Sequence, residues 1–119
     1  MKRAARSLLG SSRAHSRDVV RSPGVLDDAA SAELRVAIGQ AISQGAPRLV
    51  IDLSALTDIE AEGLAVLIYA CRAATAAHVK LVLSAPSPLL LELLEPMRLS
   101  ESYDIELEPA HVPILGPTS

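Results

Sequence analysis

The chain has 119 residues and a net charge of −3, and half of its residues are hydrophobic although none is Phe or Trp. We therefore expect one domain with an aliphatic core. Because it has only two Tyr, it lacks the base-stacking side chains of single-stranded nucleic-acid binders, and we expect no nucleic-acid partner. No apolar run approaches the roughly 18 residues of a membrane helix, and a lone Cys71 suits a reducing compartment, so we predict a cytoplasmic protein without direct membrane insertion.

Charge divides the chain into three predicted parts. Residues 1–21 carry a net charge of +5 and the remainder carries −8. We predict a basic N-terminal arm over 1–17, an acidic domain over 18–107 and a proline-containing tail over 108–119. The arm is expected to be solvated, with a weak edge strand over 5–9; contact with nucleic acid or with an acidic surface is the alternative.

The first half of the domain is predicted to hold two strands and two helices. A strand over 18–22 ends at a Pro-Gly turn, and an apolar stripe at i+4 spacing then predicts a helix that Gly45 stops. A buried strand over 49–53 leads through a polar loop into a helix over 61–76. We expect residues 57–60 to form a capping box at the start of that helix.

The second half continues the alternation of strand and helix. A strand over 79–83 is followed by a short helix from Pro88 to about residue 95, capped by Ser87, and by an edge strand over 103–107. Five leucines in six positions cover nearly the whole circumference of that short helix, so one side must face more core or a partner. The element order predicts an α/β sandwich with a mostly parallel sheet of four to five strands.

Patterns for catalysis and metal binding are lacking. Neither GxxxxGK[ST], GxGxxG nor GxSxG occurs, and the three histidines are far apart in the sequence. Glu60 and Glu62 are the most tempting acid–base pair, but two residues apart on a helix they point about 200° away from each other. We therefore predict no catalytic residue, no metal, no cofactor and no enzymatic activity. The two glutamates serve either the helix N-terminus or an acidic recognition patch.

Two stretches resemble the STAS domain of anti-sigma factor antagonists, the bacterial anti-anti-sigma proteins. Residues 50–54 and 60–67 are similar to the family's strand ending Asp-Leu-Ser and its Asp-Ser-Ser-Gly-Leu helix start, and residues 24–27 resemble its Gly-Glu-Leu-Asp run. The resemblance covers about 18–107. It implies a STAS-like sandwich and a non-enzymatic module of bacterial signalling, which regulates transcription by docking onto an anti-sigma factor, often a serine kinase.

The resemblance also implies where the partner binds. The implied partner-binding residues are Thr57, Asp58, Glu60, Ala61, Glu62, Gly63 and Leu64. Ala61 stands where the family has its phospho-accepting serine, and without a hydroxyl it cannot be phosphorylated. Ser54 and Thr57 are the possible alternative acceptors, or else turn residues. Glu62 supplies one fixed charge beside position 61, a weak imitation of a phosphate.

Two other functions stay open at this point. STAS-like domains also sit on the ATPase of ABC lipid transporters or form parts of anion transporters, and the missing serine favours such an accessory subunit. A small-molecule-binding domain that uses the acidic loop is the second alternative.

Overall fold

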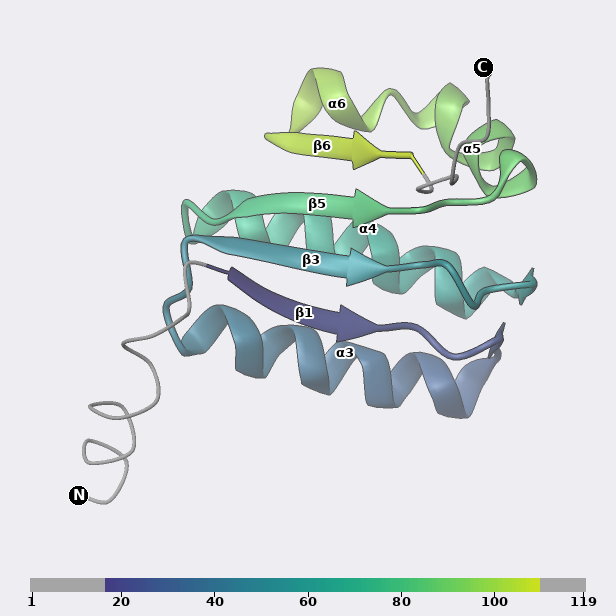
Figure 1. Cartoon of the computed structure of the whole chain (residues 1–119), viewed down its shortest axis with the longest axis horizontal. Coiled ribbons are helices and arrows are strands. Elements are labelled where there is room, and N and C mark those ends of the chain that lie inside the picture. The colour runs from purple at the N-terminus through teal and green to yellow at the C-terminus, as the bar shows by residue number, and fades with distance from the viewer. Residues whose placement is uncertain (1–16, 110–119) are drawn as a thin grey trace, which may run out of the picture.

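The computed structural model describes residues 17–109, in which strands and helices alternate (Figure 1). The strands are β1 Arg17–Arg21, β2 Val25–Leu26, β3 Arg48–Asp52, β4 Asp58–Ile59, β5 Lys80–Ser84 and β6 Ile105–Glu108. The helices are α3 Asp28–Ser43, α4 Ala61–Ala76, α5 Pro88–Leu94 and α6 Leu99–Ser102, with a 3₁₀ turn, η2, over Glu95–Met97. The predicted order is present as β1, α3, β3, α4, β5, α5 and β6, whereas β2, β4 and α6 were not predicted. The possible strand over 5–9 lies outside the described residues.

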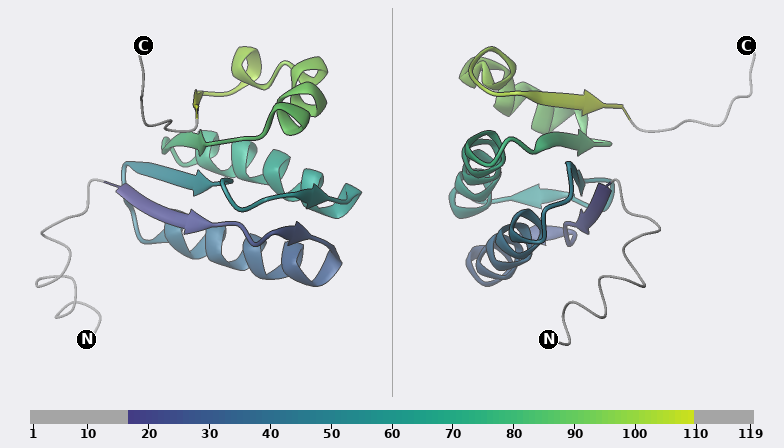
Figure 2. Two further views of the ribbon diagram at one scale, coloured as in Figure 1. Left: turned by 45° about the vertical axis from the view of Figure 1, so that its right-hand side comes forward. Right: turned by 90° about the vertical axis from the view of Figure 1, so that its left-hand side faces the viewer.

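A four-stranded parallel sheet in the order β1-β3-β5-β6 forms the frame of the domain. Each strand pairs with the next strand of the sheet along the chain, from Arg17 opposite Arg48 to Ser84 opposite Glu108. Because crossovers between parallel strands are right-handed, this sequential order places every crossover helix on the same face. Figure 2 shows the helices gathered on one side of the strands. The predicted α/β fold with a mostly parallel sheet is confirmed.

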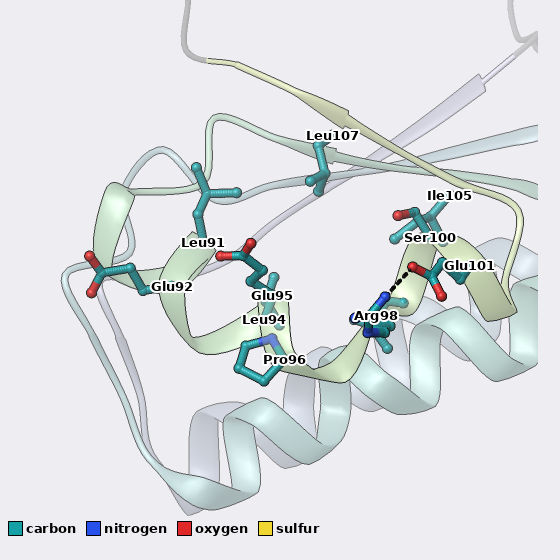
Figure 3. Close-up of a pocket in the computed structure, with 11 residues that line it drawn as sticks. Leu91, Glu92, Leu94, Glu95, Pro96, Arg98, Ser100, Glu101, Ile105 and Leu107 are labelled. Carbon is teal, nitrogen blue, oxygen red and sulfur yellow. Dashed lines mark hydrogen bonds and ion pairs between the residues drawn. The ribbon is translucent and has the colours of Figure 1, made fainter.

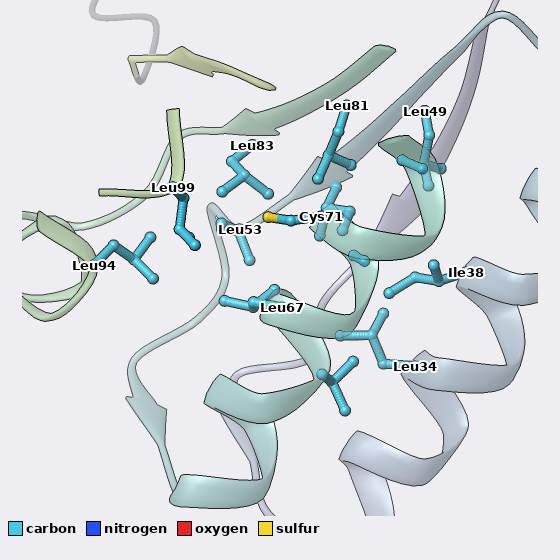
Figure 4. Close-up of a cluster of buried hydrophobic side chains, with 14 of the residues drawn as sticks. Leu34, Ile38, Leu49, Leu53, Leu67, Cys71, Leu81, Leu83, Leu94 and Leu99 are labelled. Carbon is cyan, nitrogen blue, oxygen red and sulfur yellow. The ribbon is translucent and has the colours of Figure 1, made fainter. Parts of the chain in front are cut away.

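The core lies between the sheet and this helical layer (Figure 4). It includes Leu34, Ile38, Leu49, Ile51, Leu67, Cys71, Leu81 and Leu83. Burial raises the pKa of the Cys71 thiol to about 11, so the side chain acts as a small buried hydrophobe and not as a nucleophile.

The leucine-rich helix after β5 begins as predicted and ends at Leu94, within one residue of the predicted end before Pro96. Ser87 accepts a hydrogen bond from the Leu90 N–H at 3.1 Å, and Pro88 occupies the first turn of α5. The chain then continues as the 3₁₀ turn η2, whose first turn holds Pro96 because a missing N–H costs no hydrogen bond there. The chain turns at Arg98, whose φ is 50°, and continues as α6.

Candidate functional site: the head surface

The starts of α3 and α4 meet at the carboxyl edge of the sheet, where β2 and β4 form a two-stranded parallel ribbon. Val25 pairs with Asp58 and Leu26 with Ile59, so the next residues along the two strands, Asp27 and Glu60, lie side by side. These two residues are the N-caps of α3 and α4. The ribbon therefore fixes the two helix starts relative to each other.

The loop between β3 and β4 is bound to this ribbon through Gly24. The Gly24 carbonyl accepts hydrogen bonds from the Thr57 N–H at 2.7 Å and from the Thr57 hydroxyl at 3.1 Å. The Glu60 N–H donates to the Leu26 carbonyl at 3.1 Å. The predicted capping box is therefore wrong: Thr57 bonds to a residue far away in the sequence, and Glu60 is itself the N-cap, without a side-chain hydrogen bond.

We use the name head surface for nine exposed or half-buried residues at this edge. They are Val25, Asp27, Asp28, Thr57, Asp58, Glu60, Ala61, Glu62 and Leu64. The structure thus brings together all of the predicted partner-binding residues except Gly63, which is buried below them. Leu64 is half-buried, and Ala61 is exposed in the first turn of α4.

Gly63 supports the head surface from below. A Cβ atom at this position would lie 2.8 Å from Leu26 Cγ and 2.9 Å from Ile59 Cγ1. Only a glycine lets the first turn of α4 approach β2 and β4 this closely. Its contribution to the site is the position of α4, since it has no side chain to offer a partner.

Ser54 lies before this surface, in the turn that follows β3. Its N–H donates to Asp52 Oδ1 at 2.9 Å, an Asx-type turn. This backbone hydrogen bond is the main reason why the pKa of the Asp52 carboxyl is lowered; the Ser54 hydroxyl and the Arg21 guanidinium, whose Nε lies 3.3 Å from Asp52 Oδ2, lower it further. Ser54 is exposed but serves as a turn residue here.

The head surface is acidic and lacks internal counter-charges. Its five carboxylates belong to Asp27, Asp28, Asp58, Glu60 and Glu62. The ion pairs found between residues 17 and 109 involve none of them. Three exposed or half-buried apolar side chains, Val25, Ala61 and Leu64, belong to the same edge. Such a surface can attract a basic protein and bury a small apolar patch against it.

The start of α3 belongs to this edge but was not among the predicted partner-binding residues. Asp27 and Asp28 come from a segment about 30 residues before the predicted loop, and only the β2–β4 pairing brings them to it. The signal was present in residues 24–27, which already matched a family motif. In residues 17–109 no group of His, Cys, Asp and Glu side chains is arranged to hold a metal ion, and no helix has the length and apolar character to cross a membrane.

Comparisons with known proteins agree with this fold. A family model described as "Mlab, STAS domain" matches residues 9–109. The Bacillus cell fate determinant SpoIIAA in its phosphorylated form superimposes with a TM-score of 0.65 at 23% identity, covering 80% of this chain and 85% of that one. The unphosphorylated anti-sigma factor antagonist SpoIIAA gives 0.61 at 24% identity, over 82% and 84%. A putative anti-sigma factor antagonist from Thermotoga maritima gives 0.65 at 13% identity, over 83% and 82%. No curated protein matches the chain.

Proposed function

Because the chain belongs to the STAS domain family, we propose that it is a non-enzymatic cytoplasmic module that docks through its head surface onto an anti-sigma factor of the serine-kinase class. In this role it releases a sigma factor and so regulates transcription, without a cofactor. The observation that carries the proposal is the set of five carboxylates around the exposed Ala61, none of which forms an ion pair with another residue of 17–109.

The proposed docking uses two kinds of contact. The carboxylates steer a basic partner toward the two helix starts and fix its orientation. Val25, Ala61 and Leu64 supply apolar area that is removed from water on contact. Gly63 holds α4 against the β2–β4 ribbon, so the surface is formed before the partner arrives.

Docking is proposed to be independent of phosphorylation at position 61. A phosphate there would add nearly two negative charges to a surface that is already acidic and would repel the partner. Ala61 has no hydroxyl to accept it. Ser54 and Thr57 are exposed candidates for such a switch, but their backbone and side-chain groups take part in the turn and in the bond to Gly24.

The test is affinity purification from the native cytosol with two matched variants. Ala61→Arg places a bulky cation in the middle of the head surface and should weaken capture of a kinase-like anti-sigma factor by tenfold or more, about 1.4 kcal/mol. Ala76→Arg makes the same change at the exposed far end of α4 and should leave capture unchanged. Equal capture by both variants would remove the head surface from the proposal.

The missing switch has its own test. Incubation with the captured kinase and ATP should leave the native chain unmodified, whereas Ala61→Ser should gain one phosphate and lose its partner. Mass spectrometry locates the modification. Phosphate on Ser54 or Thr57 of the native chain, together with loss of docking, would contradict a constitutive module.

An accessory subunit of an ABC lipid or anion transport complex is the second candidate. The alanine at position 61 favours it, because docking onto a transport ATPase needs no phosphate switch, and the matching family model is described as "Mlab, STAS domain". Capture of an ABC ATPase in place of a kinase would select this candidate, and capture of neither would contradict both.

A further inference from the structure

A groove of about 770 Å³ lies between β6 and the segment formed by α5, η2 and α6. None of these elements belongs to the head surface. The apolar lining of the groove consists of Leu91, Leu94, Pro96, Leu99, Ile105 and Leu107. Figure 3 shows Leu91 and Leu107 directed into the space between α5 and β6. Both are unusually exposed for leucines, at 38% and 44%, so the groove is apolar and open.

The wall of this groove is the edge of the sheet. Among the described residues β6 pairs with β5 alone. The carbonyls of Asp104 and Glu108 accept hydrogen bonds from the β5 side, from the N–H groups of Leu81 and Ala85. Because the N–H and C=O of one residue in a parallel strand point to the same side and alternate along the strand, those of Leu107 point away from β5. The open edge therefore offers a donor and an acceptor directly beside the apolar groove.

The surroundings of the groove are acidic. Glu92 and Glu95 belong to its lining, and Arg98, which also lines it, is already paired with Glu101 (Nη1 to Oε2, 2.7 Å). Glu106 and Glu108 project from the opposite face of β6. Glu106 Oε1 lies 3.6 Å from Arg48 Nη2, and the ion pairs between described residues do not include Glu108. Pairing β6 with β6 of a second copy would set these glutamates against one another, which is destabilising.

We propose that β6 receives a fifth strand from a protein partner, an extended segment in which apolar side chains alternate with lysine or arginine. The added strand bonds to the N–H and C=O of Leu107. Its apolar side chains enter the groove between Leu91 and Leu107, and its basic side chains lie on the other face beside Glu106 and Glu108. This mode of docking does not depend on the head surface.

A short synthetic peptide in which valine alternates with lysine serves as the probe, with the full chain labelled for NMR. At a peptide concentration ten times Kd, hydrogen exchange of the Leu107 amide should slow about tenfold, with chemical-shift changes confined to β6 and α5. A peptide with the same side chains in which every backbone amide is N-methylated keeps its charge and loses its backbone hydrogen-bond donors; it should not protect Leu107. The unmethylated peptide with glutamate in place of each lysine should not bind.

Two matched variants locate the site. Leu91→Lys fills the groove with a cation and should reduce peptide affinity at least tenfold, whereas Leu89→Lys makes the same change on the same helix, at a leucine that is 60% exposed and outside the groove, and should not. Equal effects of the two variants, or equal binding of the N-methylated peptide, would overturn the proposal. Protection of the Leu107 amide in the absence of peptide would also overturn it in two cases. Protection that rises with protein concentration would assign the edge to a second copy. Protection that is lost when residues 110–119 are removed would assign the edge to the chain itself.

Discussion

The starts of α3 and α4 lie side by side at one edge of the sheet but are held in place differently. At α3 a side chain caps the helix: Asp27 Oδ1 accepts a hydrogen bond from the Ala30 N–H at 3.0 Å. At α4 the N-cap Glu60 makes no such bond, and the backbone of β4 and the close contact at Gly63 fix the helix instead. A helix start that is fixed by backbone and packing leaves its surface side chains available for a partner, and the head surface around Ala61 is built on this one.

The largest effect is expected where packing holds α4. Gly63→Ala would force a methyl group against Leu26 and Ile59 and should lower the free energy of unfolding by about 1–3 kcal/mol, although the better helix propensity of alanine returns up to about 1 kcal/mol. Urea denaturation measures the change.

Gly39→Ala in α3 is the matched control. Its added methyl group would meet only the Tyr69 hydroxyl, at 3.3 Å, at the end of a side chain that can shift. This variant should be neutral or more stable than the native chain. Equal losses in the two variants would show that Gly63 has no special packing role.

An intermediate effect is expected where a side chain holds α3. Asp27→Ala removes the cap and should lower the free energy of unfolding by about 1 kcal/mol. Glu60→Ala at the matching position of α4 removes no hydrogen bond and should change it by less than about 0.5 kcal/mol. Thermal unfolding of both variants provides the comparison, and a larger loss in Glu60→Ala would contradict the assignment of the caps.

The smallest effect is a gain. Glu60→Asp keeps the charge of the head surface but supplies a side chain short enough to cap α4, so stability should rise by about 0.5–1 kcal/mol. Partner capture should be unchanged, because the number of carboxylates is the same. A stabilised variant that lost its partner would indicate that docking requires an uncapped α4.

How well the sequence predicted each region depended on how local its interactions are. The bounds of α4 and the Ser87 cap of α5 were predicted correctly, because helical periodicity and capping involve residues within a few positions of each other. The β2–β4 ribbon was missed, since two strands of two residues each have no period to detect. The capping box was wrong because the Thr57 hydroxyl donates its hydrogen bond to the carbonyl of Gly24, a residue far away in the sequence.

The leucines of α5 illustrate the same limit. Their spacing predicted that one side would face more core or a partner, and the structure places Leu90 and Leu94 in the core while Leu89 and Leu93 remain exposed. Which leucines face inward depends on how α5 packs against the core, and no local pattern contains that information. Partner-binding residues between 57 and 64 were predicted from the resemblance, whereas Asp27 and Asp28 are brought to the same edge only by the fold.

The sequential order of the sheet also has a consequence for how the domain is made. Each strand of the four-stranded sheet pairs with the next one along the chain, so β1 and β3 can associate while the later strands are still being synthesised. The strand β6 comes last of the four in the chain and is therefore synthesised last. Until it joins the sheet, β5 is the exposed edge of a growing sheet, and the groove beside Leu107 exists only once the final strand has been added.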